Sequence, residues 1–549
     1  MTGKSIMERR DFLGAAALGM ASLGALGLSG CASNASSSGA SDRLSATGAA
    51  ATVGVPETWD READVVVIGS GTVLSAAVKA VADGLETIIL EKAPMAGGTT
   101  AFSGGKCYIC CSSLVNDDRA AAKEYMMKCN VDGYVTEAMI DAYLDNGTEM
   151  IDFLIEKTGA NWQAAERTDL QPDWPGASSN MRSLNVPNAD DPTKSTGGNF
   201  TGLEIEAFEA MGGTLLTETP AVRLIARPLE DGRQEVLGVM ANDGKADVAI
   251  KARKAVIIGT GSFDWDREMC KQYLPFTTPY TFQIDTCTGD GFKMAQAVGA
   301  DCGMVTQGWG CPVEIYAYDE IESGSVTLPI NASSGDFYDT YFQGRRIGFG
   351  IPYFVVSRMG QRFYAEPGTY SSMDAWAGLD AQGDFKHRYL PYSFAIFDAA
   401  GAAESQFDTL DPLPGWLTRG ETIAELAENS GIDVRNLQVT FDRWNSDAAN
   451  GGVDTEYGRT EIQPLGDGPY YAVKCTQFYN GTHGGIKVNE KAQVLSTLGD
   501  VVPRLYATSN AAAIGAPGRV YPGAGGSIGA AKVFGYIAAK DAATLEDWA

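Results

Sequence analysis

Histidine and positive charge are scarce in this sequence. The 549 residues include only two histidines, His387 and His483, and 42 Lys and Arg stand against 69 Asp and Glu, for a formal net charge of -27. A polyanion gains nothing from counterion release on DNA or RNA, so the composition argues against a nucleic-acid partner. Acidity of this kind is typical of a solvated, soluble surface.

Cysteine is also sparse, with ten in the whole chain. Beyond Cys31 the number is odd and the chain is large, so we expect mostly reduced, buried thiols and no disulfide framework. The only cluster contains Cys107, Cys110 and Cys111, and it lacks the histidine that follows in a c-type haem motif. Core packing is our interpretation of this cluster, with an iron–sulfur centre as the open alternative. We predict no metal site.

Long apolar runs are limited to the N-terminal segment. The run from Gly14 to Leu28 is too short for a comfortable membrane span, and it follows Arg9-Arg10-Asp11-Phe12-Leu13, a twin-arginine export signal. Leu28-Ser29-Gly30-Cys31 resembles a lipoprotein cleavage box. We expect twin-arginine export and lipid anchoring through Cys31 at the outer face of the cytoplasmic membrane; a plain signal peptide with an incidental cysteine is the alternative. This route carries folded, cofactor-loaded proteins and so favours a bound redox cofactor.

A dinucleotide-binding pattern begins the ordered part of the chain. The apolar run Ala63–Ile68 is typical of a buried parallel strand and leads into Gly69-Ser70-Gly71-Thr72-Val73-Leu74 and a predicted helix over 75–83. The glycines allow a tight turn whose N–H groups can approach a pyrophosphate at the helix N-terminus. Glu91 ends the next strand, twenty residues after Gly71, where an acidic residue binds ribose hydroxyls. Leu74 replaces the usual third glycine, and a glycine-rich turn without a cofactor is the alternative.

Several further motifs carry a family resemblance. They are Gly97-Gly98-Thr99-Thr100, Ser103-Gly104-Gly105, the stretch 255–263, Thr288-Gly289-Asp290-Gly291, the stretch 505–510 and the run 518–529 with its Tyr-x-Gly-Ala-Gly sequence. With these motifs the sequence resembles the fumarate reductase and 3-ketosteroid dehydrogenase superfamily of flavoproteins. The resemblance implies FAD, bound non-covalently because no histidine precedes His387. The implied flavin contacts are Gly69, Gly71, Val73, Glu91, Gly98, Thr99, Thr100, Gly104, Gly105, Val222, Asp290, Asn510, Ser527 and Ile528.

The fold that follows is of the α/β class. We predict a Rossmann-type FAD-binding domain split in sequence, with an inserted α+β substrate (cap) domain where aromatics, glycines and irregular stretches interrupt the pattern. A tether rich in Ser, Ala and Gly precedes it. The predicted boundaries are 1–31 for the signal, 32–58 for the flexible linker, 59–309 and 451–549 for the two parts of the FAD-binding domain and 310–450 for the cap.

Two tyrosines replace the arginines of fumarate-type reductases. The motif Gly360–Glu366 places Tyr370 where those enzymes have a proton-donating arginine, and Tyr521 stands where they have the arginine that clamps a carboxylate. The 3-ketosteroid dehydrogenases have a tyrosine at both positions. The resemblance to them implies that Tyr521 and the N–H of Gly525 hydrogen-bond a ketone. Trp174 departs from that family, which carries a tyrosine in the corresponding loop. His483 lies in a loop that the family places close to the flavin.

The sequence therefore predicts an FAD-dependent oxidoreductase that acts on a C–C bond conjugated to a ketone in a flat, apolar, steroid-like molecule, more as a reductase than as a dehydrogenase. The resemblance assigns hydride exchange to flavin N5 and proton exchange to Tyr370, with a quinol-linked or cytochrome electron partner. One alternative is a reductase of a fumarate-, urocanate- or acrylate-type acid, with anion contacts from Arg345, Arg346 and Arg362. Another is a flavin-carrying electron-relay lipoprotein without substrate chemistry.

Overall fold

The computed structural model describes residues 54–548 except 166–167, 179–181, 192–194, 276–280, 282, 315–351, 367–392 and 406. The predicted signal segment, Tyr370, and the pair Arg345 and Arg346 lie outside the described residues.

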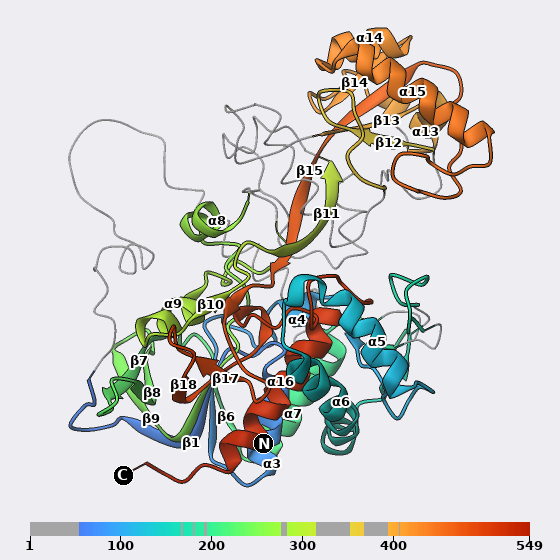
Figure 1. Ribbon diagram of the computed structural model, residues 1–549. Helices are drawn as coiled ribbons and strands as arrows, with labels where there is room; N and C mark the ends of the chain where they lie inside the picture. The colour runs from blue at the N-terminus through green and yellow to red at the C-terminus, as the bar shows by residue number, and fades with distance from the viewer. Residues whose placement is uncertain are drawn as a thin grey trace, which may run out of the picture. The chain divides into compact units, whose positions relative to one another are not determined.

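A sheet of mainly parallel strands forms the first part of the fold (Figure 1). Its parallel core runs in the order β18-β9-β1-β2-β6. Val65, Val66 and Val67 of β1 have no exposed surface, as expected for a central parallel strand covered on both faces. The sheet thus combines strands from both ends of the chain. Its strands are β1 (Arg61–Ile68), β2 (Thr87–Leu90), β6 (Thr214–Leu216), β7 (Ala221–Pro228), β8 (Gln234–Asn242), β9 (Asp247–Ile258), β17 (Gln493–Leu495) and β18 (Val501–Ala507).

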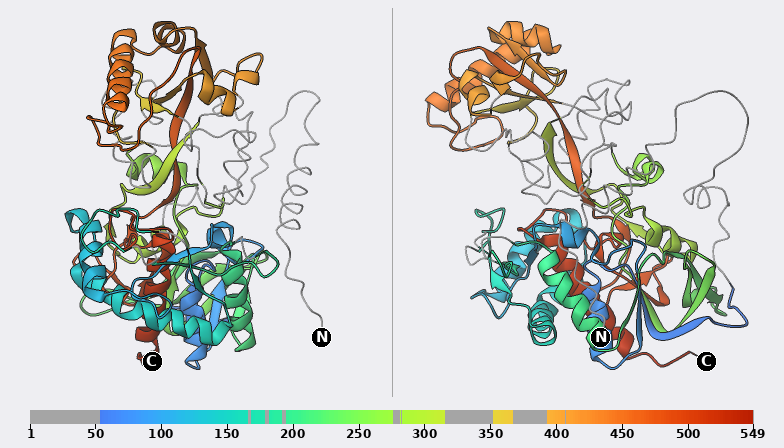
Figure 2. Two further views of the ribbon diagram at one scale, coloured as in Figure 1. Left: turned by 90° about the vertical axis from the view of Figure 1, so that its right-hand side faces the viewer. Right: turned by 180° about the vertical axis from the view of Figure 1, so that it is seen from behind.

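Helix α16 (Gly526–Ala543) is buried along most of its length and packs against α3 and α6 (Figure 2). A helix apolar on all sides is typical of a core position. Gly535 permits the close approach, since a Cβ there would lie 2.9 Å from Oγ of Ser75 on α3. The other helices of this part are α3 (Leu74–Ala82), α4 (Gly98–Phe102), α5 (Arg119–Cys129), α6 (Glu137–Thr158), α7 (Gly198–Ala210), α8 (Arg267–Tyr273) and α9 (Asp290–Ala297).

A second, antiparallel sheet has the order β11-β15-β13-β12, with β14 also paired to β15. Because β15 runs from Tyr470 to Thr482, this sheet extends past residue 450, where we predicted the inserted domain to end; the domain boundaries stay a prediction. The elements of this part are β11 (Gly308–Glu314), β12 (Phe354–Val356), β13 (Ser393–Phe397), β14 (Leu417–Gly420), β15, α13 (Ala399–Glu404), α14 (Ile423–Ser430) and α15 (Val434–Ala449).

Short strands complete the described structure: β3 (Lys106–Tyr108), β4 (Gln163–Ala164) and β5 (Ser183–Asn185) form a three-stranded sheet, and β10 (Cys302–Gly303) pairs with β16 (Gly485–Ile486). The predicted mixed α/β class is confirmed. No helix within the described ranges is long and apolar enough to cross a membrane.

Candidate active site

The first glycine turn joins β1 to α3 at the carboxyl end of the parallel sheet. Gly69 has a φ of 99°, and a Cβ there would lie 2.4 Å from the carbonyl oxygen of Gly259, which follows β9. A side chain at Gly259 would in turn meet Val73, whose Cβ would be 2.3 Å away. The glycines thus allow close packing between the ends of β1 and β9, and Leu74 at the third glycine position is fully buried.

Glu91 lies directly after β2 and beside the glycine turn. Its side chain accepts hydrogen bonds from the hydroxyl of Ser70 and from the N–H of Ala93 (2.7 Å), and the residue is 5% exposed. Burial raises the pKa of this carboxyl, although these hydrogen bonds oppose the shift. Ser70 also accepts from the N–H of Gly97 (2.9 Å), so one hydroxyl links the turn, the carboxylate and the second glycine loop.

The second glycine loop packs against the first. A Cβ at Gly98, the first residue of α4, would lie 3.5 Å from Cα of Gly71. Oγ1 of Thr99 accepts from the N–H of Ile284 (3.2 Å), and the carbonyl of Thr100 accepts from Oγ of Ser103 (2.7 Å). That hydroxyl also accepts from the N–H of Gly105 (3.2 Å), while the carbonyl of Gly104 accepts from Oγ of Ser195 (3.3 Å).

Two more predicted contacts lie on the Glu91 side of the site. The carboxylate of Asp290 accepts from Nζ of Lys92 at 2.9 Å. Val222 lies in β7, three residues after Thr219, whose N–H donates to the carbonyl of Glu91 (2.9 Å).

The end of β18 brings Asn510 to the same edge of the sheet. Asn510 lies in a 3-10 turn, η5 (Ser509–Ala511), and the hydroxyl of Ser509 accepts from the N–H of Gly261 (3.2 Å) in the loop after β9. Gly481 packs against Asn510, since a Cβ at Gly481 would lie 2.4 Å from Nδ2 of Asn510.

The N-terminus of α16 brings Tyr521 and Gly525 together. Gly525 caps the helix with a φ of 90°, and a Cβ there would lie 2.3 Å from the carbonyl carbon of Lys106. Burial raises the pKa of the Tyr521 hydroxyl, while the Ser527 side chain and the N–H groups of Gly525, Gly526 and Ser527 oppose the rise. Several donors at this helix N-terminus thus interact with one phenol oxygen. Ile528 follows in the first turn of the helix.

These residues fit FAD. Two glycine loops expose backbone N–H groups beside the N-terminus of α3, where a pyrophosphate is stabilised, and a buried carboxylate lies next to them. The loops after β9 and β18 and the first turn of α16 supply further polar groups to the site. The individual flavin contacts stay predictions.

His483 lies in an aromatic stack that the sequence did not reveal. Its ring stacks on Trp309 (centroids 4.1 Å apart, planes 5° apart) and on Tyr134 (5.3 Å), and Trp309 also contacts Tyr521 edge to face (4.8 Å). Burial, with a smaller contribution from Arg519, lowers the pKa of His483 to about 3. Burial therefore favours the neutral form of the imidazole. No signal in the sequence connects residues so far apart along the chain.

Trp174 lies in a loop that contacts the residue after Tyr521. Its ring packs against Tyr125 (centroids 6.5 Å apart), and the Tyr125 hydroxyl donates to the carbonyl of Pro522 (2.7 Å). The N–H of Leu170 donates to the same carbonyl (2.9 Å). Sequence analysis missed Tyr125, which supplies a phenol next to Trp174.

Arg362 and two of the clustered cysteines, all residues of the alternative hypotheses, lie inside the fold. The buried guanidinium of Arg362 pairs with Glu366 and with Asp454 (2.7 Å). Cys107 and Cys110 are buried free thiols, and burial raises the pKa of each. No three His, Cys, Asp or Glu side chains are grouped so as to hold a metal in the described part of the chain. Cys107 and Cys110 therefore pack in the core, and the absence of a metal site stays a prediction.

The fold and the site together define a flavoprotein. The chain belongs to the FAD-binding-domain family, whose model matches residues 64–528. It is 28% identical to the 3-oxosteroid 1-dehydrogenase of Mycolicibacterium smegmatis, over 88% of this chain and 97% of that protein. It is also 28% identical to the digoxin reductase of Eggerthella lenta, over 99% of this chain and 98% of that protein.

A solved structure shares the fold. The 3-ketosteroid Δ1-dehydrogenase of Sterolibacterium denitrificans, in complex with 1,4-androstadiene-3,17-dione, superposes with a TM-score of 0.73 at 22% identity, covering 88% of this chain and 99% of that one. FAD is thus the cofactor, and the chain is an FAD-dependent oxidoreductase that is similar to the ketosteroid dehydrogenases and fumarate reductases. The predicted enzyme class, which acts on CH–CH groups, is confirmed.

The Glu91→Ala variant should bind FAD about 10- to 150-fold more weakly, because a hydrogen bond to a charged group contributes roughly 1.5–3 kcal/mol. The measurement is the flavin-to-protein absorbance ratio after dialysis. Glu230→Ala, which changes an exposed glutamate between β7 and β8, is the control and should keep its flavin. Full occupancy in the Glu91 variant would contradict the assignment of this carboxylate to the cofactor.

Proposed function

We propose that the enzyme reduces, or in reverse forms, a C–C double bond conjugated to a ketone in a flat, apolar, steroid-like molecule. The observation that supports this most is the pairing of the Tyr521 hydroxyl with the N–H groups at the start of α16, among them that of Gly525. A ketone oxygen that replaces the phenol oxygen as the acceptor of the Gly525 N–H can also accept from the Tyr521 hydroxyl, so both groups can donate to one carbonyl oxygen. Tyr521 is buried and Gly525 is half-buried, and donors that are shielded from water have their largest effect.

The two donors stabilise negative charge on the ketone oxygen as the conjugated bond changes order. Bound FAD supplies hydride exchange with the β-carbon. Because burial raises the pKa of Tyr521, its hydroxyl stays protonated and remains a donor at neutral pH. In this proposal Tyr370 exchanges the proton at the α-carbon. A phenol with a pKa of about 10 can donate a proton at neutral pH, which suits the reducing direction.

An acidic substrate is less well supported. A carboxylate is recognised best by a bidentate arginine, and Arg362, the one described candidate, is held by two carboxylates inside the fold. Tyr521, where a clamping arginine would stand, is a neutral hydrogen-bond donor. A neutral donor of this kind is sufficient to hydrogen-bond a ketone oxygen.

A screen of electron acceptors tests the proposal. Enzyme reduced anaerobically with a dye is mixed with a 3-ketosteroid enone, with fumarate or with urocanate, and reoxidation is followed by absorbance. Rapid reoxidation by the enone alone is expected. Reoxidation by a carboxylate and not by enones would contradict the ketone proposal, and no reoxidation by any of them would favour an electron-relay protein.

We further propose that the enzyme works outside the cytoplasm and receives electrons from a quinol-linked or cytochrome partner. The twin-arginine sequence and Cys31 support this location, and an external electron path favours reduction over oxidation. Cell fractionation of a Cys31→Ala variant tests the anchor, since release from the membrane fraction is expected.

A further inference from the structure

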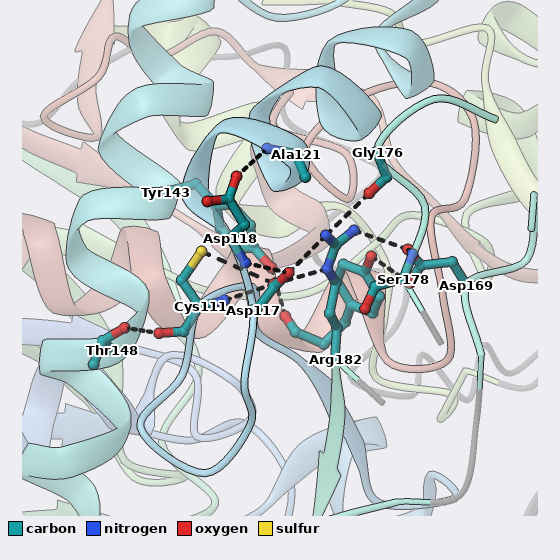
Figure 3. A network of polar contacts seen from close by, with 11 residues as sticks. Cys111, Asp117, Asp118, Ala121, Tyr143, Thr148, Asp169, Gly176, Ser178 and Arg182 are labelled. Atoms are coloured by element: carbon teal, nitrogen blue, oxygen red, sulfur yellow. Dashed lines mark hydrogen bonds and ion pairs between the residues drawn. The ribbon is translucent and has the colours of Figure 1, made fainter. Parts of the chain in front are cut away.

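A buried ion cluster lies at the start of β5 (Figure 3). Nε and one terminal nitrogen of Arg182 donate to the two oxygens of Asp117 at 2.8 Å, and the other terminal nitrogen donates to Asp169 at 2.8 Å. None of the three side chains is more than 3% exposed. The cluster contains one cation and two carboxylates, so it carries excess negative charge in the interior. Further hydrogen-bond donors must stabilise this charge.

The carboxylate of Asp169 recruits such donors and thereby fixes a tyrosine. It accepts from the hydroxyl of Tyr108 (2.7 Å) and from the N–H of Ser178 (2.9 Å). Burial raises the pKa of Asp169, whereas the charge of Arg182 and these hydrogen bonds favour the ionised form. The ring of Tyr108 is almost fully buried and its hydroxyl is bound to Asp169, so both the ring and the hydroxyl are held in place.

Tyr108 packs directly against the segment 522–525, which connects Tyr521 to Gly525. A Cβ at Gly523 would lie 2.3 Å from Cε2 of the Tyr108 ring, so the glycine and the ring fit against each other without a gap. The N–H of Tyr108 donates to the carbonyl of Gly525 (3.1 Å).

Residues next to Asp169 and Arg182 in the sequence donate hydrogen bonds to two further carbonyl groups of the segment 522–525. The N–H of Leu170, next to Asp169, donates to Pro522 (2.9 Å), and Oγ of Ser183, next to Arg182, donates to Ala524 (2.8 Å). The carbonyl oxygens of residues 522, 524 and 525 are therefore all hydrogen-bonded by residues in or beside the cluster.

We propose that Asp169 and Arg182 are positioning residues of the ketone site: they hold the segment 522–525 so that the Tyr521 hydroxyl and the Gly525 N–H converge on one oxygen. This inference rests on the function proposed above. The cluster touches neither substrate nor cofactor in this role, and acts only through Tyr108 and the backbone of the segment.

The test is a double-mutant cycle on flavin-loaded enzyme. Asp169→Asn should lower kcat for an enone by about 10- to 100-fold, the cost of misplacing a catalytic group by a fraction of an ångström to one ångström. In the Tyr521→Phe background the same substitution should have almost no further effect, because the group that it positions has already been removed. A merely structural role would lower the yield of folded protein and leave the kcat of each flavin-loaded molecule unchanged.

Glu235→Gln is a matched control. Glu235 is buried on β8 and pairs with Arg227 and Arg504 at 2.8 Å each, so this substitution neutralises a buried carboxylate in a second arginine–carboxylate cluster that has no role in the proposed reaction. Its kcat should equal that of the wild type. If Asp169→Asn does not fold, the Tyr108→Phe variant is measured instead, since it removes only the hydroxyl that donates to Asp169. A lowered kcat of this variant supports the inference.

Two results overturn the inference. Wild-type kcat in the Asp169 or Tyr108 variant, with Tyr521→Phe impaired, refutes the positioning role alone. An Asp169→Asn effect that is equally large in the Tyr521→Phe background also refutes it. Full activity of Tyr521→Phe itself would instead remove the proposed function on which the inference rests.

Discussion

The Tyr521→Phe variant should convert an enone substrate with kcat and kcat/KM both lowered by about 10²–10³. Removal of one donor to a developing oxyanion typically has this effect, and an interaction made mainly in the transition state lowers both parameters together. The phenylalanine ring can keep the edge-to-face contact with Trp309, so folding and flavin content should survive. Because burial raises the pKa of Tyr521, the wild-type rate should not fall through its ionisation below pH of about 10. Anaerobic steady-state kinetics measure these parameters.

Tyr536→Phe is the matched control for that experiment. It removes a hydroxyl from the same helix, α16, where Tyr536 donates to Glu149 at 3.0 Å. Its kinetic parameters should equal those of the wild type. Near-wild-type turnover by Tyr521→Phe would refute carbonyl binding by this residue.

The Tyr370→Phe variant should lose turnover by about 10²–10⁴, the usual contribution of general acid catalysis. Tyr370 lies outside the described residues, but the motif that locates it is fixed nearby: Glu366 pairs with Arg362 and accepts from the N–H of Val355 (2.6 Å). Substrate binding, followed as a perturbation of the flavin spectrum, should persist, because the variant lacks a proton donor and keeps the ketone contacts.

Tyr364→Phe serves as the control, since Tyr364 lies in the same motif, is buried and has no role in the proposed reaction. It should retain wild-type turnover. A Tyr370→Phe variant with full turnover of a substrate that requires Tyr521 would assign proton delivery to another group.

Local pattern predicted the parallel sheet and its glycine turn well. The apolar run at β1, the glycines after it and the spacing to Glu91 are all encoded within thirty residues, and the structure places them together. The partner of β15 could not be predicted in this way, because alternation along a strand shows which face is buried and not which strand lies beside it. The pairing of β15 with β11, β13 and β14 depends on tertiary contacts, and the domain boundary at residue 450 stays a prediction.

The residues around Tyr521 were predicted only in part. The C-terminal motif identified Tyr521 and Gly525 as a pair through its resemblance to the 3-ketosteroid dehydrogenases, and the structure places Gly525 at the start of α16. Arg182 was missed because its partner Asp117 lies 65 residues away, in a segment with no pattern of its own. The stacking of Trp309 on His483 likewise depends on tertiary packing, which cannot be predicted from composition or from the spacing of residues.

The place of β18 beside β9 in the chain's main sheet has a consequence for biosynthesis. β18 pairs with β9 across about 250 residues of sequence, and α16, which follows it, fills the core against α3. Contacts of such long range form late, because loop closure must come before they are gained. A ribosome that has translated the first 500 residues has therefore produced every strand of the parallel core except β18, together with an unfilled place for α16. Cofactor loading must wait until synthesis is almost complete, which makes maturation a post-translational event.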